Sequence, residues 1–200
     1  YLLFLLMATT TVLSPGPGVV MTLSNALRFG LRGTLGGIVG IAGGALLVAA
    51  ISATSLGILL ATSALAFTAL KLLGAAYLFY LAIRLWRAPP FSFAAQPTRD
   101  ASFGRRFVEG LSLQLTNPKA IFFFLSVFPQ FIDPAQPYPL QFATLVLTYS
   151  TLVIVIHCGY ALFARRAKGW LQSERGGRLL GKISAGSFVY FGASLATVQR

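Results

Sequence analysis

The sequence has few charged residues, and those few are unbalanced. Charged residues make up 10 % of the 200 residues, with sixteen Lys and Arg against four Asp and Glu. A soluble globular domain carries about 25 % charged residues, because it needs a solvated outer face. This shortage excludes an ordinary soluble domain. The hydrophobic share of 56 % and the mean hydropathy of +0.76 instead indicate a chain that lies in a lipid bilayer.

The residue types that carry most enzyme chemistry are also scarce. Cys158 is the single cysteine, which excludes an intrachain disulfide and a cysteine cluster, and His157 is the single histidine. The four acids lie in loops or near the ends of apolar runs, and the sequence has no phosphate-binding glycine loop of the P-loop type. We therefore expect no enzyme activity, no metal site and no cofactor.

The hydrophobic residues gather in long runs, which predict an all-α integral membrane protein with about six transmembrane helices. The runs cover about 1–27, 34–61, 65–86, 107–132, 140–163 and 179–198. The first run has no basic segment before it and continues past a cluster of proline and glycine. We therefore interpret it as a span and not as a cleaved signal peptide.

Basic residues cluster in short polar stretches at about 28–33, 84–106 and 165–178, whereas the loops near 62–64 and 133–139 carry none. On a soluble chain the net charge of +12 would suggest a nucleic-acid partner. The alternation of basic and non-basic loops is instead typical of the positive-inside rule. We expect a multi-pass protein of the plasma (inner) membrane, with the basic loops in the cytoplasm and both termini outside. The sequence leaves open whether it forms a homo-oligomer.

One long polar segment divides the chain into halves with three predicted spans each. A duplicated unit with an odd number of spans inserts its second copy upside down. We therefore predict a single transporter domain over 1–200, built from two inverted three-helix repeats. Repeat one covers about 1–87, repeat two covers about 106–200, and a cytoplasmic linker covers about 88–105. The first helix of each repeat is broken by proline.

The two breaks lie near the centres of their runs, at residues 14–17 (Ser-Pro-Gly-Pro) and 117–119 (Asn-Pro-Lys). Proline removes an N–H donor and frees backbone carbonyls, which are costly in hydrocarbon unless they line a cavity or are satisfied within the protein. Paired breaks in corresponding positions indicate a substrate site at the midplane, although each could also be a simple kink. The candidate substrate-binding residues are Ser14, Pro15, Gly16, Pro17, Gln114, Asn117, Pro118 and Lys119.

Lys119 is the most informative charge, because it lies near the centre of its run. An uncompensated charge there costs at least ~3 kcal/mol. Lys119 could meet a substrate carboxylate, or it could brace the carbonyls freed at the breaks. Asn117 supplies both a donor and an acceptor beside it.

Three further ionisable residues, Lys71, Glu109 and His157, are candidates for gating or coupling. Lys71 lies about two turns into the third run and could instead snorkel outward. His157 could relay protons, although a hydrogen-bonded packing role is favoured. Glu109 could equally pair with a neighbouring arginine, Arg105 or Arg106.

The second run carries glycines spaced four residues apart, which lie along adjacent stripes of one side of the predicted helix. Small residues at this spacing allow two helix backbones to approach closely. We expect a packing seam between helices in preference to a substrate role. The residues are Gly33, Gly36, Gly37, Gly40 and Gly44.

Motifs over nearly the whole chain resemble the lysine and homoserine/threonine exporter family (LysE/RhtB). They are residues 14–17 with the glycine-rich second run, Leu70–Leu78 in the third run, Gly110–Ala120 with its Asn-Pro-Lys, and Phe122–Phe131 in the fourth run. The resemblance implies that the chain exports amino acids or related small metabolites across the plasma membrane. It also implies that the proton gradient drives this efflux.

Two positions depart from the family pattern. Members usually have Asp or Asn after the Pro-Gly-Pro, where this chain has Gly18, and Asn three residues before the Asn-Pro-Lys, where it has Gln114. The first departure removes a polar group from the expected site, so a second positive charge on the substrate would lack a partner. We therefore predict a small neutral amino acid, of the threonine, homoserine or leucine kind, in preference to lysine or arginine.

Two other classes of function remain as alternatives. A non-transporting membrane scaffold or assembly protein would use the broken helices only for packing. An ion or metal exporter is disfavoured because the runs contain no deep carboxylates or thiolate clusters. A transporter should need Asn117 and Lys119 beyond folding, whereas a scaffold should tolerate their replacement.

Overall fold

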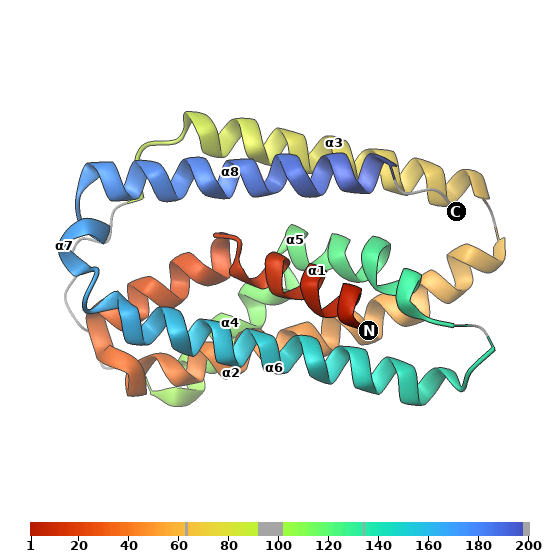
Figure 1. The fold of residues 1–200 in the computed structure, drawn as a ribbon, viewed down its shortest axis with the longest axis horizontal. Coiled ribbons are helices and arrows are strands. Elements are labelled where there is room, and N and C mark those ends of the chain that lie inside the picture. Colours follow the sequence, from red (N-terminus) through yellow and green to blue (C-terminus); the bar gives the residue numbers. More distant parts are fainter. Residues whose placement is uncertain (63, 92–101, 134, 198–200) are drawn as a thin grey trace.

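The computed structural model describes residues 1–62, 64–91, 102–133 and 135–197, and these residues are almost entirely helical. Figure 1 shows a bundle of helices with a separate pair of long helices lying along one side of it. The bundle contains α1 (Leu2–Leu13), α2 (Pro17–Thr62), α4 (Phe103–Leu115), α5 (Pro118–Phe122) and α6 (Tyr138–Ala164). The pair contains α3 (Ala64–Arg87) and α8 (Glu174–Thr197), and the short α7 (Lys168–Leu171) connects α6 to α8. Most of the predicted linker at 88–105 lies outside the described residues.

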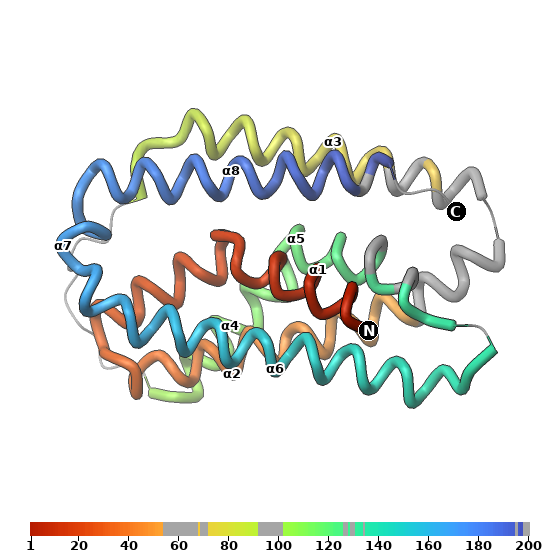
Figure 2. The backbone as a smooth tube through the Cα atoms, viewed as in Figure 1, coloured from red at the N-terminus to blue at the C-terminus, as the bar shows by residue number. Residues whose placement is uncertain are grey.

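Each of the six predicted apolar runs folds as helix, so the all-α prediction is confirmed. The first run forms α1 and the start of α2, and the second run forms the rest of α2 beyond a bend at Gly30 (φ 68°, ψ −174°). Because a positive φ is unfavourable for a residue with a Cβ atom, glycine suits this bend. The fourth run forms α4, α5, a π-helical turn over Phe123–Val127 and a 3₁₀ turn over Phe128–Phe131. The smooth backbone trace makes the bend in α2 and the interruption between α4 and α5 easy to follow (Figure 2).

Within the described residues, two helical segments are long and apolar enough by themselves to cross a bilayer. They are Pro17–Ala53 and Tyr138–Ala164. α1 is apolar but shorter, because the first break ends it at Leu13. A broken span therefore reaches across a membrane only as the sum of its two parts, since a span needs about 20 residues.

The two halves of the chain pack on each other reciprocally. The second span, in α2, lies against α4, where a Cβ atom at Gly40 would collide with the carbonyl oxygen of Phe107 and one at Gly110 would collide with that of Gly37. The predicted glycine seam is therefore confirmed as a packing surface at Gly36, Gly40 and Gly44, whereas Gly33 faces the Phe29 side chain of its own helix. In return, α6 lies against α1 and the start of α2, with Ala161 and Val19 in one buried cluster.

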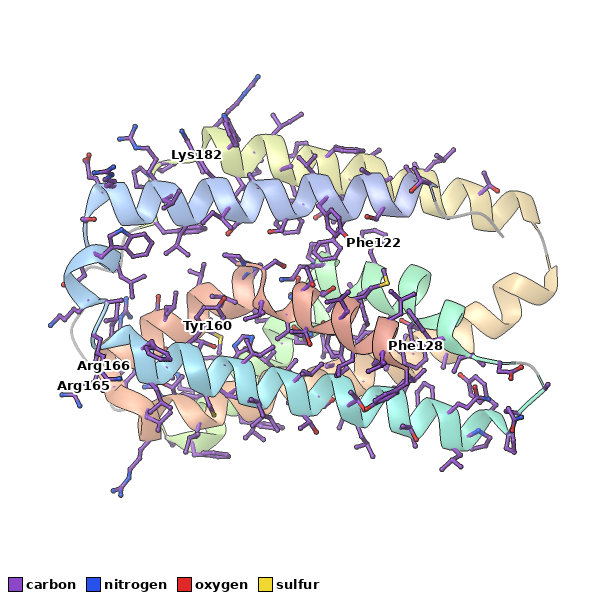
Figure 3. The ribbon with its side chains drawn as sticks, viewed as in Figure 1. Phe122, Phe128, Tyr160, Arg165, Arg166 and Lys182 are labelled. Carbon is purple, nitrogen blue, oxygen red and sulfur yellow. The ribbon has the colours of Figure 1, made fainter. Side chains whose placement is uncertain are left out.

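The pair of α3 and α8 has its own small core of Ala75, Leu78, Ala82 and Phe188. Phe122 of α5 reaches from the bundle toward this pair (Figure 3) and contacts α3 at Gly74, where a Cβ atom would overlap its ring. The pair and the bundle therefore meet at the level of the second break.

Candidate functional site

The first break lies between α1 and α2, at residues 14–16. α1 ends at Leu13, Ser14 has an extended backbone (φ −65°, ψ 129°), and α2 starts at Pro17. Pro15 and Pro17 carry no N–H group, so they cannot donate to carbonyls in the last turn of α1. Those carbonyls need other donors, because an unpaired backbone group in a membrane interior costs several kcal/mol.

Lys119 supplies hydrogen-bond donors that the first break lacks. Its Nζ atom donates to the carbonyl oxygens of Thr11 (2.9 Å) and Ser14 (2.7 Å) and to Ser14 Oγ (3.1 Å). A lysine ammonium has three donors, so these contacts use all of them. Only 8 % of Lys119 is exposed. Of the two uses that the sequence left open, the structure therefore shows the bracing of freed carbonyls.

Two hydroxyl groups from other helices lie against further carbonyls of the first break. Tyr160 of α6 (labelled in Figure 3) donates its hydroxyl to the carbonyl oxygen of Leu13 at 2.6 Å. Ser187 Oγ of α8 lies 3.3 Å from the carbonyl oxygen of Pro15, and 3.0 Å from the carbonyl oxygens of Ile183 and Ser184 in its own helix, which share its single hydrogen. The first break is thus held by side chains from three distant parts of the chain.

The second break lies between α4 and α5 and is closed locally. Asn117 caps α5, since its Oδ1 atom accepts from the backbone N–H of Lys119 at 3.1 Å. Its Nδ2 atom donates to Gln114 Oε1 at 3.2 Å. Gln114 and Asn117 are both buried. The predicted site residues of this half therefore lie together and satisfy one another.

The structure brings the two breaks into direct contact, as the sequence predicted. Besides the Lys119 hydrogen bonds, a Cβ atom at Gly16 would lie 3.2 Å from Lys119 Nζ. Glycine at this position therefore leaves the space that the ammonium group occupies. Any larger side chain at position 16 would press on it.

A cavity of about 610 Å³ adjoins the breaks and separates part of the bundle from α3 and α8. Gly16 and Pro17 of the first break and Pro118 of the second line it, together with residues of α3 and α8 such as Tyr77 and Phe188. The volume falls within the range of ~300–1,000 Å³ typical of small-molecule sites. The cavity extends toward the end of the molecule that carries the basic loops, because its lining continues along α3 to Arg84, Leu85 and Ala88.

The other end of the bundle is filled by aromatic side chains. The Phe4 ring of α1 lies with its centroid 5.3 Å from that of Phe131 and 6.1 Å from that of Phe123. Tyr149 of α6 lies 4.9 Å from Phe124 and 4.8 Å from Phe123. Phe4, Phe123, Phe124 and Tyr149 are each at most 2 % exposed. The two breaks thus divide a closely packed half of the bundle from a half that borders a cavity.

His157 lies in a hydrogen-bonded packing position. Its Nδ1 atom is 2.7 Å from Thr22 Oγ1, and 4 % of the residue is exposed. A Cβ atom at Gly18 would lie 3.3 Å from His157 Cε1 and 3.5 Å from Ile41. The side chain that family members usually carry at position 18 would therefore point toward His157. The polar group that is missing at position 18 would thus have been a neighbour of His157, which is one of the candidate coupling residues.

Glu109 and Lys71 differ in how far the structure describes them. Glu109 forms an i,i+4 ion pair with Arg105 (Nε to Oε1, 3.2 Å), and both side chains are about half exposed. Lys71 lies in α3, and its side chain is outside the described part of the structure. Among the described residues, no three His, Cys, Asp or Glu side chains gather where they could hold a metal ion.

Sequence reasoning missed Tyr160, Ser187 and Arg84. The two hydroxyl donors act on backbone carbonyls 147 and 172 positions away, and a backbone acceptor leaves no pattern in the sequence. Arg84 had been assigned to a basic loop, and it also lines the cavity.

The chain is similar to known efflux proteins over nearly its whole length. Residues 9–199 match the family model described as LysE type translocator. The homoserine/homoserine lactone efflux protein of Salmonella typhimurium is 36 % identical over 196 residues, which cover 98 % of this chain and 95 % of the relative. An uncharacterized membrane protein of Vibrio cholerae is 35 % identical, covering 100 % of this chain and 97 % of the relative, and the leucine efflux protein of Salmonella typhimurium is 31 % identical, covering 100 % and 95 %. No solved structure matches the chain.

Proposed function

The chain belongs to the LysE type translocator family, and we propose that it exports small neutral amino acids from the cytoplasm across the plasma membrane. The observation that carries this proposal is the cavity that both helix breaks line together with α3 and α8. A membrane scaffold would have no need for a cavity at the meeting point of two broken spans. A transporter needs one there, since its substrate has to reach polar backbone at the midplane.

The substrate would enter from the end with the basic loops and lie beside Gly16. Lys119 Nζ is adjacent to that position, and its contact with Ser14 Oγ (3.1 Å) is the longest of its three. The α-carboxylate of an amino acid would replace that contact, because a charged acceptor forms a stronger hydrogen bond than a hydroxyl does. Carbonyl oxygens of the first break and Asn117 would then receive the substrate ammonium group. Binding in this scheme exchanges hydrogen bonds and leaves no group of the site unpaired.

A neutral side chain fits this cavity better than a basic one. The described lining is mostly apolar, and its one charged residue, Arg84, is itself positive. A second ammonium or a guanidinium on the substrate would find no carboxylate among the described lining residues, and a buried unpaired charge is expensive. The relatives named for export of homoserine and of leucine also act on amino acids with neutral side chains.

We further infer that the halves, 1–87 and 106–200, are inverted repeats with both termini outside the cytoplasm. The reciprocal packing of α2 on α4 and of α6 on the first span supports this, as does the pairing of α3 with α8. Gly169, in the basic loop, and Gln136, in the loop without basic residues, report the orientation. In a background with Cys158 replaced by serine, an impermeant thiol reagent on whole cells should label Gln136→Cys and spare Gly169→Cys. The reverse labelling would contradict this orientation.

We propose the proton gradient as the driving force. The described residues bury Lys119 and His157, whose amine and imidazole groups can exchange a proton, and neither is a carboxylate that would favour a metal ion. Export from preloaded cells should therefore fall when a protonophore collapses the gradient and should be insensitive to replacement of sodium by potassium.

Counterflow in proteoliposomes tests the function itself. Vesicles preloaded with one unlabelled amino acid should accumulate labelled threonine, homoserine or leucine when the protein is present. Vesicles preloaded with lysine or arginine should accumulate little of these labelled amino acids. A scaffold would give no counterflow with any member of the panel, and faster exchange of lysine than of threonine would contradict the neutral preference.

A further inference from the structure

Two further cavities lie where the bend of α2 meets the end of α6. The larger has a volume of about 520 Å³ and is lined by residues 26–30 of the bend together with Arg165 and Lys168. Arg28 within the bend gives this cavity a third basic side chain. A cavity with three cations and no acidic lining residue is suited to an anion.

The bend is a fixed part of this site. Gly30 has a positive φ of 68°, and Thr34 Oγ1 holds its carbonyl oxygen at 2.8 Å. The guanidinium carbon of Arg106 lies 3.4 Å from the centroid of the Phe29 ring, and Arg106 is 3 % exposed. The bend is therefore anchored from α4 as well as from its own helix, and it presents Arg28 in a defined place.

The smaller cavity, of about 350 Å³, shares Arg165 with the larger one and differs in chemistry. Its lining combines the apolar Leu31, Ala161 and Leu162 with Arg165 and Arg166. Figure 3 shows the two arginines together at the end of the molecule where α6 meets α7. Leu162 is 54 % exposed, so the apolar side of this cavity continues onto the outer surface of α6.

These basic groups have no acidic partner in the described part of the chain. The ion pairs found there join Arg105 to Glu109 and Arg178 to Glu174. Neither pair includes Arg28, Arg165, Arg166 or Lys168. The positive charge at this place is therefore available to an external anion.

We propose that these two cavities form a binding site for one anionic phospholipid of the surrounding leaflet. The phosphate and the negatively charged head group lie in the larger cavity against Arg28, Arg165 and Lys168, and an acyl chain follows Leu31 and Leu162 past Arg166. The neighbouring apolar and basic linings select a lipid over a free phosphate, because a soluble anion gains nothing from the apolar cavity. Anionic lipids favour such basic pockets at the cytoplasmic side of membrane proteins. The site is separate from the proposed transport cavity and does not depend on its substrate.

Native mass spectrometry of the full chain in detergent tests the proposal. The protein is exposed to an equimolar mixture of phosphatidylglycerol and phosphatidylcholine with identical acyl chains, and the retained lipid is counted. We expect retained phosphatidylglycerol to exceed phosphatidylcholine, and Arg165→Gln to lower that preference about fivefold. Arg178→Gln is the matched control, since Arg178 lies at the same end of the molecule but pairs with Glu174. It should leave the preference unchanged.

Two further arms separate a lipid site from a phosphate site and from a general effect of charge. Excess glycerol 3-phosphate should not displace the retained lipid, and Leu162→Gln should lower retention although it removes no charge. If Arg165→Gln does not elute as folded protein, Arg28→Gln replaces it with the same expected loss. Equal retention of the two lipids, equal effects of Arg165→Gln and Arg178→Gln, or complete displacement by glycerol 3-phosphate would each overturn the proposal.

Discussion

The two helix breaks differ in where the hydrogen-bond partners of their polar groups come from. In the second break, Asn117 caps the next helix and bonds to Gln114, so residues within four positions satisfy one another. In the first break, the carbonyls of Thr11, Leu13 and Ser14 accept from Lys119 and Tyr160, which come from the other half of the chain. One break is closed by local sequence and the other only by the folded protein.

This difference indicates which break can change during a transport cycle. A locally capped break keeps its hydrogen bonds wherever its helix moves. The first break can move relative to the other half only if Lys119 exchanges its partners. Lys119 belongs to both breaks, because its backbone N–H completes the Asn117 cap and its side chain braces α1. It is therefore the residue through which a substrate would act on both halves.

Charge reversal at Lys119 should give the largest effect. Lys119→Glu removes the donors to two carbonyls and adds a negative charge beside them, so we expect export to be abolished while membrane insertion remains measurable. Efflux of threonine from preloaded cells, normalised to the amount of protein in the membrane, measures this. Lys182→Glu is the control, since Lys182 is exposed on α8 with its Nζ atom 5.3 Å from the Trp86 ring. If Lys119→Glu exported as well as the unchanged protein, the first break would not need its brace.

Crowding the first break should have the next largest effect. A Cβ atom in Gly16→Ala would lie 3.2 Å from Lys119 Nζ, so the ammonium group has to shift by a few tenths of an ångström. Overpacking of this kind costs about 1–3 kcal/mol. We expect a lower thermal midpoint in detergent and slower efflux. Gly186→Ala, where a Cβ atom meets nothing within 4 Å, should leave both properties close to those of the unchanged protein.

Removing one hydrogen-bonding side chain from each break compares the two directly. Tyr160→Phe leaves the exposed Leu13 carbonyl without its hydroxyl donor, and an intramolecular hydrogen bond of this kind contributes about 0.5–1.5 kcal/mol. Asn117→Ala removes a helix cap, which costs about 0.5–2 kcal/mol, and it also takes the donor from the buried Gln114 Oε1 atom. Thermal unfolding in detergent should therefore rank Asn117→Ala as at least as destabilising as Tyr160→Phe. A Tyr160→Phe protein with unchanged stability would argue against the long-range closure of the first break.

Glu109→Gln should have the smallest effect. The Glu109–Arg105 pair is half exposed and lies one turn apart on α4, and such pairs contribute about 0–1 kcal/mol. We expect efflux and stability within the error of the unchanged protein. A large loss of efflux at unchanged stability would show that Glu109 has a coupling role that its position does not suggest.

The sequence predicted the parts of this structure that depend on local composition. Proline and glycine at 14–17 and the Asn-Pro pair at 117–118 marked both breaks, and the spacing of glycines in the second run marked the surface that packs on α4. It could not decide the role of Lys119, because its side-chain partners are backbone carbonyls more than a hundred positions away. It also could not show that position 18 faces His157, since that depends on how α6 packs on the first span.

The most direct test of the central claim restores the ammonium group chemically. In a background with Cys158 replaced by serine, Lys119→Cys should not export threonine. Alkylation with 2-bromoethylamine rebuilds a side chain of the same length that ends in an ammonium group, and 1-bromopropane gives a neutral side chain of that length. With both alkylations verified by mass spectrometry, we expect efflux to return only with the aminoethyl group. Equal recovery with the propyl group, or no recovery after complete aminoethylation, would contradict the claim that a cation from the second break holds the first.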